Sequence, residues 1–274
     1  MTGDSRAVRG DFGRSALGLC DVTEPCHSTR SRIVKFSREF IALTLDFACH
    51  VERIKVVPLE QALLHFTPLY LSFGLPRDFD PLNPIWRAFL AGLARHQEPV
   101  DWAYRYYLQR QAHGREDLDL DPTFGCFYYA LWPENRVRIH FRNGDETNRG
   151  PLSRARRPQR LAELAAMFRH LRRVLPPAAT VVGGSWLYNI EAYRSLYPPE
   201  FLASSRVGAD EYQFIAHWGQ FLDRHGEVRP MMVRTFMDRL ARQASAEGLP
   251  QCFPYRVLRL ESSIDAFYDL YGIR

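Results

Sequence analysis

The spacing of apolar residues changes once along this chain, and this change constrains the fold more than any other feature. Over residues 33–113 apolar residues recur at intervals of about 3.6, as in "PIWRAFLAGLARH", where Ile85, Phe89 and Leu93 share one side of a helix. After Pro122 apolar and polar residues alternate, as in "RVRIHFRN". The sequence therefore predicts a helical region followed by a region built on β-strands.

The change falls within the acidic, turn-forming segment "HGREDLDLDPTFG". Asp117, Asp119 and Asp121 alternate there, and such a row of carboxylates is one way to bind calcium. The segment lacks the glycine and the final glutamate of an EF-hand loop. We therefore interpret it as a solvated linker between the two regions.

The predicted organisation has three parts. Residues 1–30 lack helical or strand periodicity and are expected to form a flexible tail, residues 31–121 a helical region and residues 122–274 an α/β region. The chain has 274 residues, of which 46% are hydrophobic, so it is long enough to bury a large core. The expected fold class is α+β, with a mixed central sheet that has helices on both sides.

The cysteine pattern and the lengths of the apolar stretches indicate the cellular location and whether the chain binds a metal. The five cysteines are odd in number and include no C-x-x-C, which favours reduced thiols over a disulfide framework. Cys26 with His27 and Cys49 with His50 are adjacent pairs whose side chains point in different directions, so we expect no zinc site. No apolar stretch has the length of a signal peptide core or a membrane span. We expect a cytoplasmic protein that neither crosses a membrane nor binds a metal.

The segment after the linker predicts a βαβ unit. "TFGCFYYALW" and "RVRIHFRN", joined by "PEN", predict a β-hairpin in which Val137, Ile139 and Phe141 share one face and His140 lies on the other. "RPQRLAELAAMFRHLRRVL" predicts a helix with Pro158 in its first turn, and "ATVVGGSWL" predicts a short buried strand. The arginine-rich segment "GDETNRGPLSRARRPQR" lies between the hairpin and this helix.

Positive charge is concentrated around this arginine segment. Residues 136–173 contain eleven arginines and three acidic residues, a local formal charge of +8, whereas the whole chain carries +5. The first amides of a helix lack intrahelical partners and carry the positive end of the dipole, so this turn is a natural anion site. Gly150 lets the backbone approach a ligand, and Arg154, Arg156 and Arg157 add charged hydrogen bonds to a phosphate-bearing ligand.

A solvated surface loop explains the same arginines without a ligand. Of the 36 basic residues only Lys35 and Lys55 are lysine, so arginine is common throughout the chain. The segment contains neither the phosphate-binding G-x-x-x-x-G-K-[ST] nor the dinucleotide-binding G-x-G-x-x-G motif.

Short motifs on either side of the predicted helix resemble a known family. "IHF" at Ile139, "GPLS" at Gly150 and "SWL" at Ser185, with the helix through Phe168, resemble the C-terminal module of bacterial acyltransferases of the GNAT-like superfamily. The resemblance covers about a quarter of the chain. It implies a βαβ acyl-transfer module in which the loop and helix start between the two central strands hold the pyrophosphate of coenzyme A.

The leading functional hypothesis follows from this resemblance and from the charge. It is an acyltransferase that moves an acyl group from acyl-CoA, the expected cosubstrate, to a small molecule or another acceptor bearing an amine. His140 is the candidate base, and a backbone amide near Ser185 is the candidate donor to the developing oxyanion. Gly150, Arg154 and the neighbouring arginines are the candidate cofactor-binding residues. The alternative is a non-enzymatic module whose basic surface binds nucleic acid or an acidic partner.

Other motifs carry less chemistry. "GGSWL" resembles a nucleophile elbow, but Leu187 stands where G-x-S-x-G requires its second glycine, so a serine hydrolase is a weak alternative. His217 and His225 lack the H-E-x-x-H spacing of a zinc site, and we interpret both as surface residues. We interpret the many tyrosines as core or interface residues.

Overall fold

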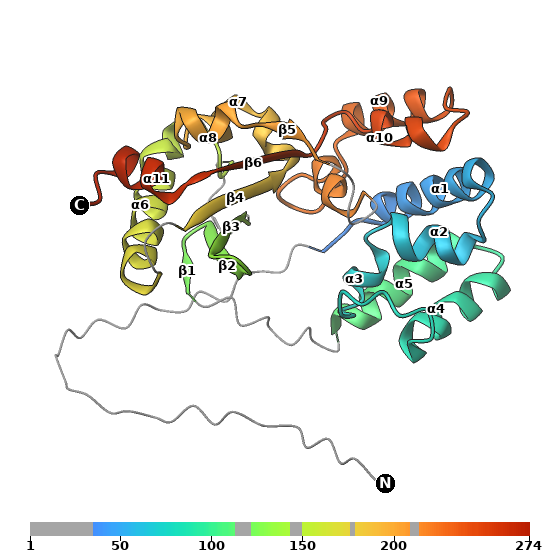
Figure 1. The fold of residues 1–274 in the computed structure, drawn as a ribbon. Helices are drawn as coiled ribbons and strands as arrows, with labels where there is room; N and C mark the ends of the chain where they lie inside the picture. Colours follow the sequence, from blue (N-terminus) through green and yellow to red (C-terminus); the bar gives the residue numbers. More distant parts are fainter. Residues whose placement is uncertain (1–34, 113–121, 143–149, 176–178, 209–213) are drawn as a thin grey trace, which may run out of the picture. The chain divides into compact units, whose positions relative to one another are not determined.

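The computed structural model describes residues 35–112, 122–142, 150–175, 179–208 and 214–274. These residues belong to one compact unit, Arg32–Arg274. The predicted tail, the Cys26–His27 pair and the three alternating aspartates of the linker lie outside the described residues. The described part of the chain combines helices with one mixed sheet of six strands, as Figure 1 shows. The predicted α+β fold is confirmed.

Prolines divide the first helical region into short helices. Pro58 and Pro68 immediately precede two of the helices, and Pro84 and Pro99 begin two others, positions at which the missing amide breaks no helical hydrogen bond. Asn83 caps the fourth helix, because its side-chain oxygen accepts hydrogen bonds from the backbone amides of Ile85 and Trp86. The helices are α1 (Arg38–Lys55), α2 (Leu59–Phe66), α3 (Leu69–Ser72), α4 (Pro84–Arg95) and α5 (Pro99–Ala112).

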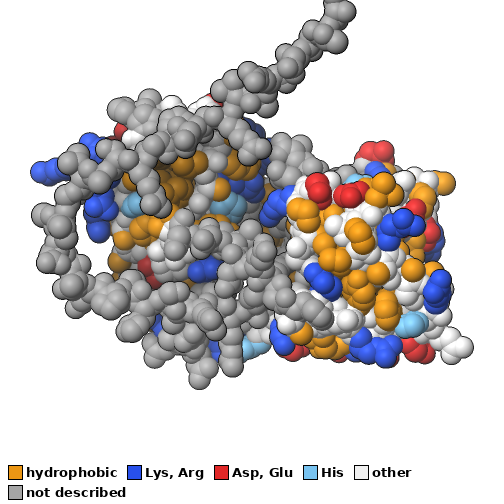
Figure 2. All heavy atoms as spheres, turned by 90° about the horizontal axis from the view of Figure 1, so that it is seen from below, with side chains coloured by type: hydrophobic (Ala, Val, Ile, Leu, Met, Phe, Trp, Pro, Cys, Tyr) orange, Lys and Arg blue, Asp and Glu red, His pale blue; other side chains and the backbone are white. Residues whose placement is uncertain are grey.

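An aromatic core joins these helices to a segment from late in the chain. Around the ring of Phe47, four aromatic rings lie with centroids between 5.4 and 6.0 Å away: Phe214, Trp218, Phe236 and Phe253. They belong to residues 214–253, which form η3 (Ile215–Phe221), α9 (Pro230–Leu240), η4 (Ala246–Gly248) and α10 (Leu249–Cys252). We call this core the helical cluster. On the face shown in Figure 2, acidic, basic and hydrophobic side chains are interspersed over the helices.

This packing differs from the expected organisation of the chain. Residues 122–274 were expected to form one α/β region, but residues 214–253 contribute to the helical cluster and the chain then returns to the sheet. Apolar periodicity identifies the buried face of a helix and carries no information on which cluster that face joins.

The six strands are β1 (Thr123–Phe124), β2 (Phe127–Trp132), β3 (Arg136–Phe141), β4 (Thr180–Ser185), β5 (Arg206–Val207) and β6 (Leu258–Ser263), in the spatial order β1-β2-β3-β4-β6-β5. Strands β3 and β4 are parallel, and the other neighbouring pairs are antiparallel. The predicted hairpin is present, with Trp132 paired to Arg136 across a three-residue turn. Glu134 and Asn135 in this turn have positive φ angles of 63° and 55°.

The predicted βαβ unit is also present. Between the parallel strands β3 and β4 lie η1 (Arg154–Arg156) and α6 (Arg157–Val174). Leu164, Phe168 and Leu171 on α6 are fully buried in a second hydrophobic cluster, the sheet cluster, and Phe168 stacks on Phe267 with the ring centroids 4.6 Å apart. Phe267 belongs to α11 (Ile264–Tyr271), which follows β6 and lies beside α6 in Figure 1. Between β4 and β5 lie η2 (Trp186–Asn189), α7 (Glu191–Arg194) and α8 (Pro199–Ala203).

The two central strands separate before they end. The parallel register of β3 with β4 stops at the pair Arg138 and Val182, although β3 continues to Phe141 and β4 to Ser185. On its other edge β4 stays paired with β6 as far as Ser185, which pairs with Leu258. The edge of β4 from Gly183 onward that faces β3 therefore lies outside the parallel ladder. We call this segment the open end of β4.

Candidate ligand-binding site

A pocket of about 250 Å³ lies at the start of α6. Its lining comes from the arginine segment, from the first turns of α6 and from α7 with the two residues that follow it: Leu152, Ser153, Arg154, Arg157, Arg160, Glu191, Ala192, Ser195 and Leu196. Three arginines and one glutamate are the charged residues in this lining. We call it the arginine pocket.

Spacing by three explains which arginines line this pocket. Side chains three residues apart in a 3₁₀ turn lie above one another, and η1 spans Arg154–Arg156 immediately before α6 begins. Arg154, Arg157 and Arg160 therefore lie on one side of the helix start. Arg157 also donates to the backbone oxygen of Ser195 at 3.1 Å, which ties the start of α6 to the end of α7.

The other two predicted binding residues lie outside the lining. Arg156 donates instead to the side-chain oxygen of Gln159. Gly150 is exposed, and a Cβ built on it has no atom within 4 Å, so packing in the described structure does not require glycine there. Of the four residues predicted to bind a cofactor, the structure brings Arg154 and Arg157 to the pocket.

Arg160 also lines the pocket and was not among the predicted binding residues. It is 1% exposed, its Nη2 lies 2.8 Å from the Glu163 carboxylate, and its Nη1 contacts the Cys126 thiol. Glu163 also accepts a hydrogen bond of 3.1 Å from the Cys126 backbone amide. The sequence indicates that Arg160 is buried, because it precedes Leu164 by four residues and therefore lies on the apolar side of α6.

The lining combines charge with apolar surface. Leu152, Ala192 and Leu196 supply apolar atoms, and the Ser153 hydroxyl is buried without a hydrogen-bond partner among the described residues. In such surroundings water screens charges poorly, so a guanidinium attracts an anion more strongly than it does at an open surface. Most of the exposed lining surface is apolar, and the Arg154 and Arg157 side chains with the Ser153 hydroxyl are the groups that could bind a phosphate or another anion.

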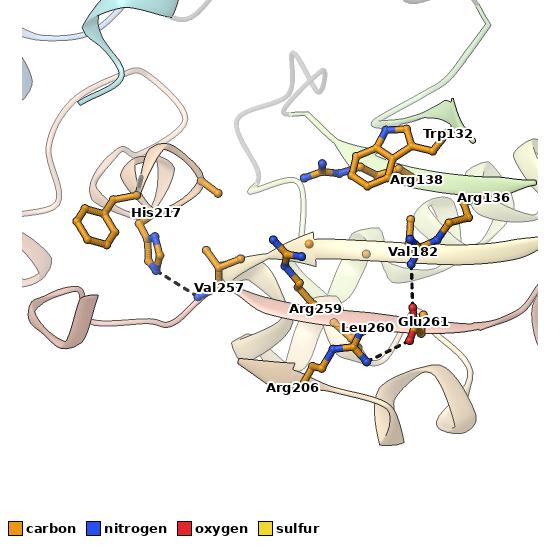
Figure 3. Close-up of a pocket in the computed structure, with 14 residues that line it drawn as sticks. Trp132, Arg136, Arg138, Val182, Arg206, His217, Val257, Arg259, Leu260 and Glu261 are labelled. Carbon is orange, nitrogen blue, oxygen red and sulfur yellow. Dashed lines mark hydrogen bonds and ion pairs between the residues drawn. The ribbon is translucent and has the colours of Figure 1, made fainter. Parts of the chain in front are cut away.

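A second cavity, of about 150 Å³, lies on the opposite face of the sheet, and we call it the sheet-face cavity. Alternation along β3 sends Val137 into the sheet cluster and Arg136 and Arg138 to this other face. Arg206 of β5 and both Arg259 and Glu261 of β6 join them, as Figure 3 shows. The remaining lining residues are Trp132, Val182, Gly183, Gly184, Phe214, Ala216, His217, Val257 and Leu260.

Ion pairs and stacking order the side chains in this cavity. Glu261 accepts from Arg136 at 2.9 Å through one carboxylate oxygen and from Arg206 at 3.1 Å through the other. The guanidinium carbon of Arg138 lies 4.8 Å from the centre of the Trp132 ring, which is a cation–π contact.

His140 faces away from Ile139, as predicted, and stacks on Tyr128 with ring centroids 4.7 Å apart. Burial, followed by the positive charges of Arg138 and Arg77, lowers its pKa to about 4. The imidazole is therefore neutral at pH 7 and holds a proton weakly. His140 is not among the lining residues of either cavity.

Ser185 lies at the open end of β4, where the sequence analysis placed a donor. Its hydroxyl accepts a hydrogen bond of 3.1 Å from the Leu187 amide and so caps η2. The side chain thus has a structural role, and the neighbouring backbone stays the candidate donor.

Three tyrosines pack beneath the open end of β4. The rings of Tyr188, Tyr193 and Tyr197 have centroids between 5.0 and 5.4 Å apart, and a Cβ built on Gly183 would overlap the Tyr188 hydroxyl. Burial raises the pKa of Tyr193 to about 12 and raises those of the other two well above their usual value. All three phenols are neutral hydrogen-bond donors at pH 7. Tyr193 and Tyr197 have a helical spacing of four residues, but Tyr188 lies five residues before Tyr193, so no single period links the three.

The prediction for one of the two late histidines is wrong. His225 is exposed, as expected, but His217 is 1% exposed and packs on Phe253 with ring centroids 4.6 Å apart. The Val257 amide donates to its Nε2 at 3.4 Å. Burial in the helical cluster, reinforced by the charge of Arg256, lowers its pKa to about 4.

Within the described ranges, no group of three or more His, Cys, Asp or Glu side chains is arranged to hold a metal ion. Among the helices that the structure describes, none combines the length and the apolar character needed to cross a bilayer. Comparisons with models of protein families, with curated proteins and with solved structures found no match.

Proposed function

We propose that this protein is an acyltransferase that moves an acyl group from a coenzyme A thioester to an amine. The observation that carries the proposal is the combination, within one βαβ unit, of the arginine pocket at the start of α6 and the open end of β4. A CoA thioester needs both features, because it has charged phosphates at one end and a reactive carbonyl at the other. Arg154 and Arg157 would hold the phosphates.

The open end of β4 suits the remainder of the cosubstrate. The linker of coenzyme A contains amide groups, which can hydrogen-bond to a strand edge beyond its ladder as an added strand does. A backbone amide near Ser185 would then donate to the thioester oxygen as negative charge develops on it. Fixed donors of this kind stabilise the transition state, and positioning of the two reactants supplies most of the rest.

In the proposed reaction the amine nitrogen attacks the thioester carbon, a C–N bond forms and the C–S bond breaks. The amine loses a proton, and coenzyme A leaves as the thiol. His140 is neutral and can accept a hydrogen bond from the amine, but its pKa of about 4 makes it a poor final proton acceptor. The neutral tyrosines under Gly183 are candidate donors to the departing sulfur.

Calorimetric titration with acetyl-CoA, desulfo-CoA and a long-chain acyl-CoA tests the proposal. Arg154→Gln is the informative variant, because Arg154 lines the pocket and its exposed side chain makes little contribution to folding. Arg156→Gln is the matched control. It removes the same charge two residues from Arg154, but the Arg156 side chain lies outside the pocket lining. A charge-assisted hydrogen bond contributes about 1.5–3 kcal/mol, so Arg154→Gln should weaken binding at least about tenfold.

The control variant should bind within about threefold of the wild type, since Arg156 lies outside the pocket lining and charges that make no direct contact contribute little through water. If the wild type binds none of the three compounds, or if both variants lose the same affinity, the proposal fails. The alternative function is a basic surface that binds nucleic acid. That alternative predicts a steep loss of affinity for DNA or RNA with salt, which the same preparation can be used to measure.

A further inference from the structure

Positive charge dominates the sheet-face cavity, on the side of the sheet away from α6. Its described lining has four guanidinium groups, from Arg136, Arg138, Arg206 and Arg259, and one carboxylate, from Glu261. A guanidinium presents two parallel N–H groups that match the two oxygens of a carboxylate. The cavity is therefore built to receive an anionic group.

Gly184 forms the floor of this cavity between two of the arginines. It pairs with Arg259 across the β4–β6 ladder, and a Cβ built on it would lie 3.4 Å from Nη2 of Arg138. Figure 3 shows Arg138 and Arg259 extending from the strands on either side of β4. The absence of a side chain at Gly184 leaves space between the two guanidinium groups.

Glu261 adds a complementary site for a positive group. Each of its oxygens accepts one hydrogen bond from an arginine, and a carboxylate oxygen has a second lone pair for another donor. An ammonium group can use these positions while a carboxylate on the same small molecule contacts the guanidinium groups. The cavity volume of about 150 Å³ is the size that holds a six-membered ring in an engineered protein cavity.

The cavity also adjoins the place where the proposed reaction would occur. Gly184 belongs both to the cavity lining and to the open end of β4, where the thioester carbonyl is placed under the proposed function. Glu261 pairs with Val182, two residues before Gly184, so an amine held at Glu261 would lie beside the open end of β4 on the face opposite α6.

We propose that the sheet-face cavity binds the acyl acceptor and that this acceptor is an amino acid, with its carboxylate on the arginines and its amine at Glu261. This inference rests on the proposed acyltransferase function. The amino acid enters as an ammonium, loses a proton to solvent and attacks the thioester. A C–N bond forms, the C–S bond breaks, and the products are an N-acyl amino acid, coenzyme A as the thiol and one proton.

Calorimetry on the full chain without coenzyme A tests the cavity by itself. The probes are L-glutamate, L-alanine and ethylamine, which is L-alanine without its carboxylate. We expect L-glutamate to bind more tightly than L-alanine, because it brings a second carboxylate to four arginines, and we expect no binding of ethylamine. O-phosphoethanolamine is the fourth probe, because a phosphate also fits guanidinium groups.

Two variants change the cavity in different ways. Arg138→Gln removes one guanidinium, and Gly184→Val fills the floor without removing an arginine. Each should weaken L-glutamate binding at least about tenfold, the effect of losing one charged hydrogen bond. Arg87→Gln, on an exposed position of α4, is the control and should bind as the wild type does. Circular dichroism checks folding, and if Arg138→Gln unfolds, Gly184→Val still tests the inference.

Each outcome supports or overturns the inference. Equal binding of ethylamine and L-alanine overturns it, as does binding of O-phosphoethanolamine with no binding of either amino acid. If desulfo-CoA binds but neither amino acid binds, with or without desulfo-CoA present, the amino-acid site is wrong and the acyltransferase proposal stands. If the amino acids bind as expected but no coenzyme A compound binds, the cavity assignment stands and the acyltransferase proposal fails.

Discussion

Replacing Glu163 with glutamine should reveal how strongly the buried arginine of the arginine pocket depends on its ion pair. The side chains of Arg160 and Glu163 are 2% and 13% exposed, and their charged atoms lie 2.8 Å apart. Removing one partner of a buried ion pair typically costs about 3–5 kcal/mol, because the other charge stays buried without compensation. Glutamine keeps the shape of the side chain and one oxygen acceptor. We therefore expect a smaller loss in the free energy of unfolding, about 2–3 kcal/mol.

Thermal unfolding followed by circular dichroism measures this loss. In chains of roughly this size each kcal/mol lowers the melting temperature by about 2–4 °C, so Glu163→Gln should melt about 4–12 °C below the wild type. The double variant Arg160→Met with Glu163→Gln removes both charges. It should recover at least half of the loss, because neutral replacements of a buried pair are often as stable as the pair.

Two results would refute this reasoning. Glu163→Gln within about 0.5 kcal/mol of the wild type would mean that the pair contributes no more than a surface substitution does. A double variant less stable than Glu163→Gln alone would mean that Arg160 stabilises the fold through packing and not through its compensated charge.

Three further predictions concern other parts of the structure. Gly183→Ala places a methyl group against the buried Tyr188 hydroxyl and should lower the free energy of unfolding by about 1–3 kcal/mol in urea titrations; unchanged stability would contradict the packing beneath β4. Burial lowers the pKa values of His140 and His217 from 6.5 to about 4, so the unfolded chain binds protons first as the pH falls. Stability should be complete above about pH 6.5 and decline toward pH 4, and a flat profile from urea titrations across this range would be the opposing result. Asn83→Ala removes the cap of α4 and should cost about 1 kcal/mol, whereas Asn83→Asp should retain most of the stability; equal losses in both variants would exclude the capping role.

The sequence predicted local structure well because local structure has a periodic signature. Alternation placed Val137 and Ile139 on the buried face of the hairpin, and the proline at position 158 marked the first turn of the crossover helix. The sequence identified the arginine segment, but only two of the four predicted binding residues, Arg154 and Arg157, line the pocket. The 3₁₀ turn before α6 has no signature in the sequence, and it is this turn that aligns Arg154 with Arg157 and turns Arg156 away.

Long-range features were beyond the reach of such patterns. The four arginines of the sheet-face cavity come from three strands that are distant in the sequence, and only the strand order β3-β4-β6-β5 brings them together. His217 was expected at the surface because histidine is polar, whereas its neighbours on η3 carry it into an aromatic core. The polarity of a side chain predicts whether it prefers to be exposed, but the packing of its helix or strand decides whether it is buried.

The return of residues 214–253 to the helical cluster has a consequence for how the chain folds. Strand β6 can pair with β4 only after a long loop has closed, and the entropy lost in closing a loop rises with its length. Packing of that loop onto the helices first shortens the free chain that remains to be closed, so formation of one cluster should promote completion of the other. A fragment that begins at residue 122 would have to leave Trp218 and its aromatic neighbours without their helical partners. We therefore expect such a fragment to aggregate, and the full chain to unfold in a single cooperative transition.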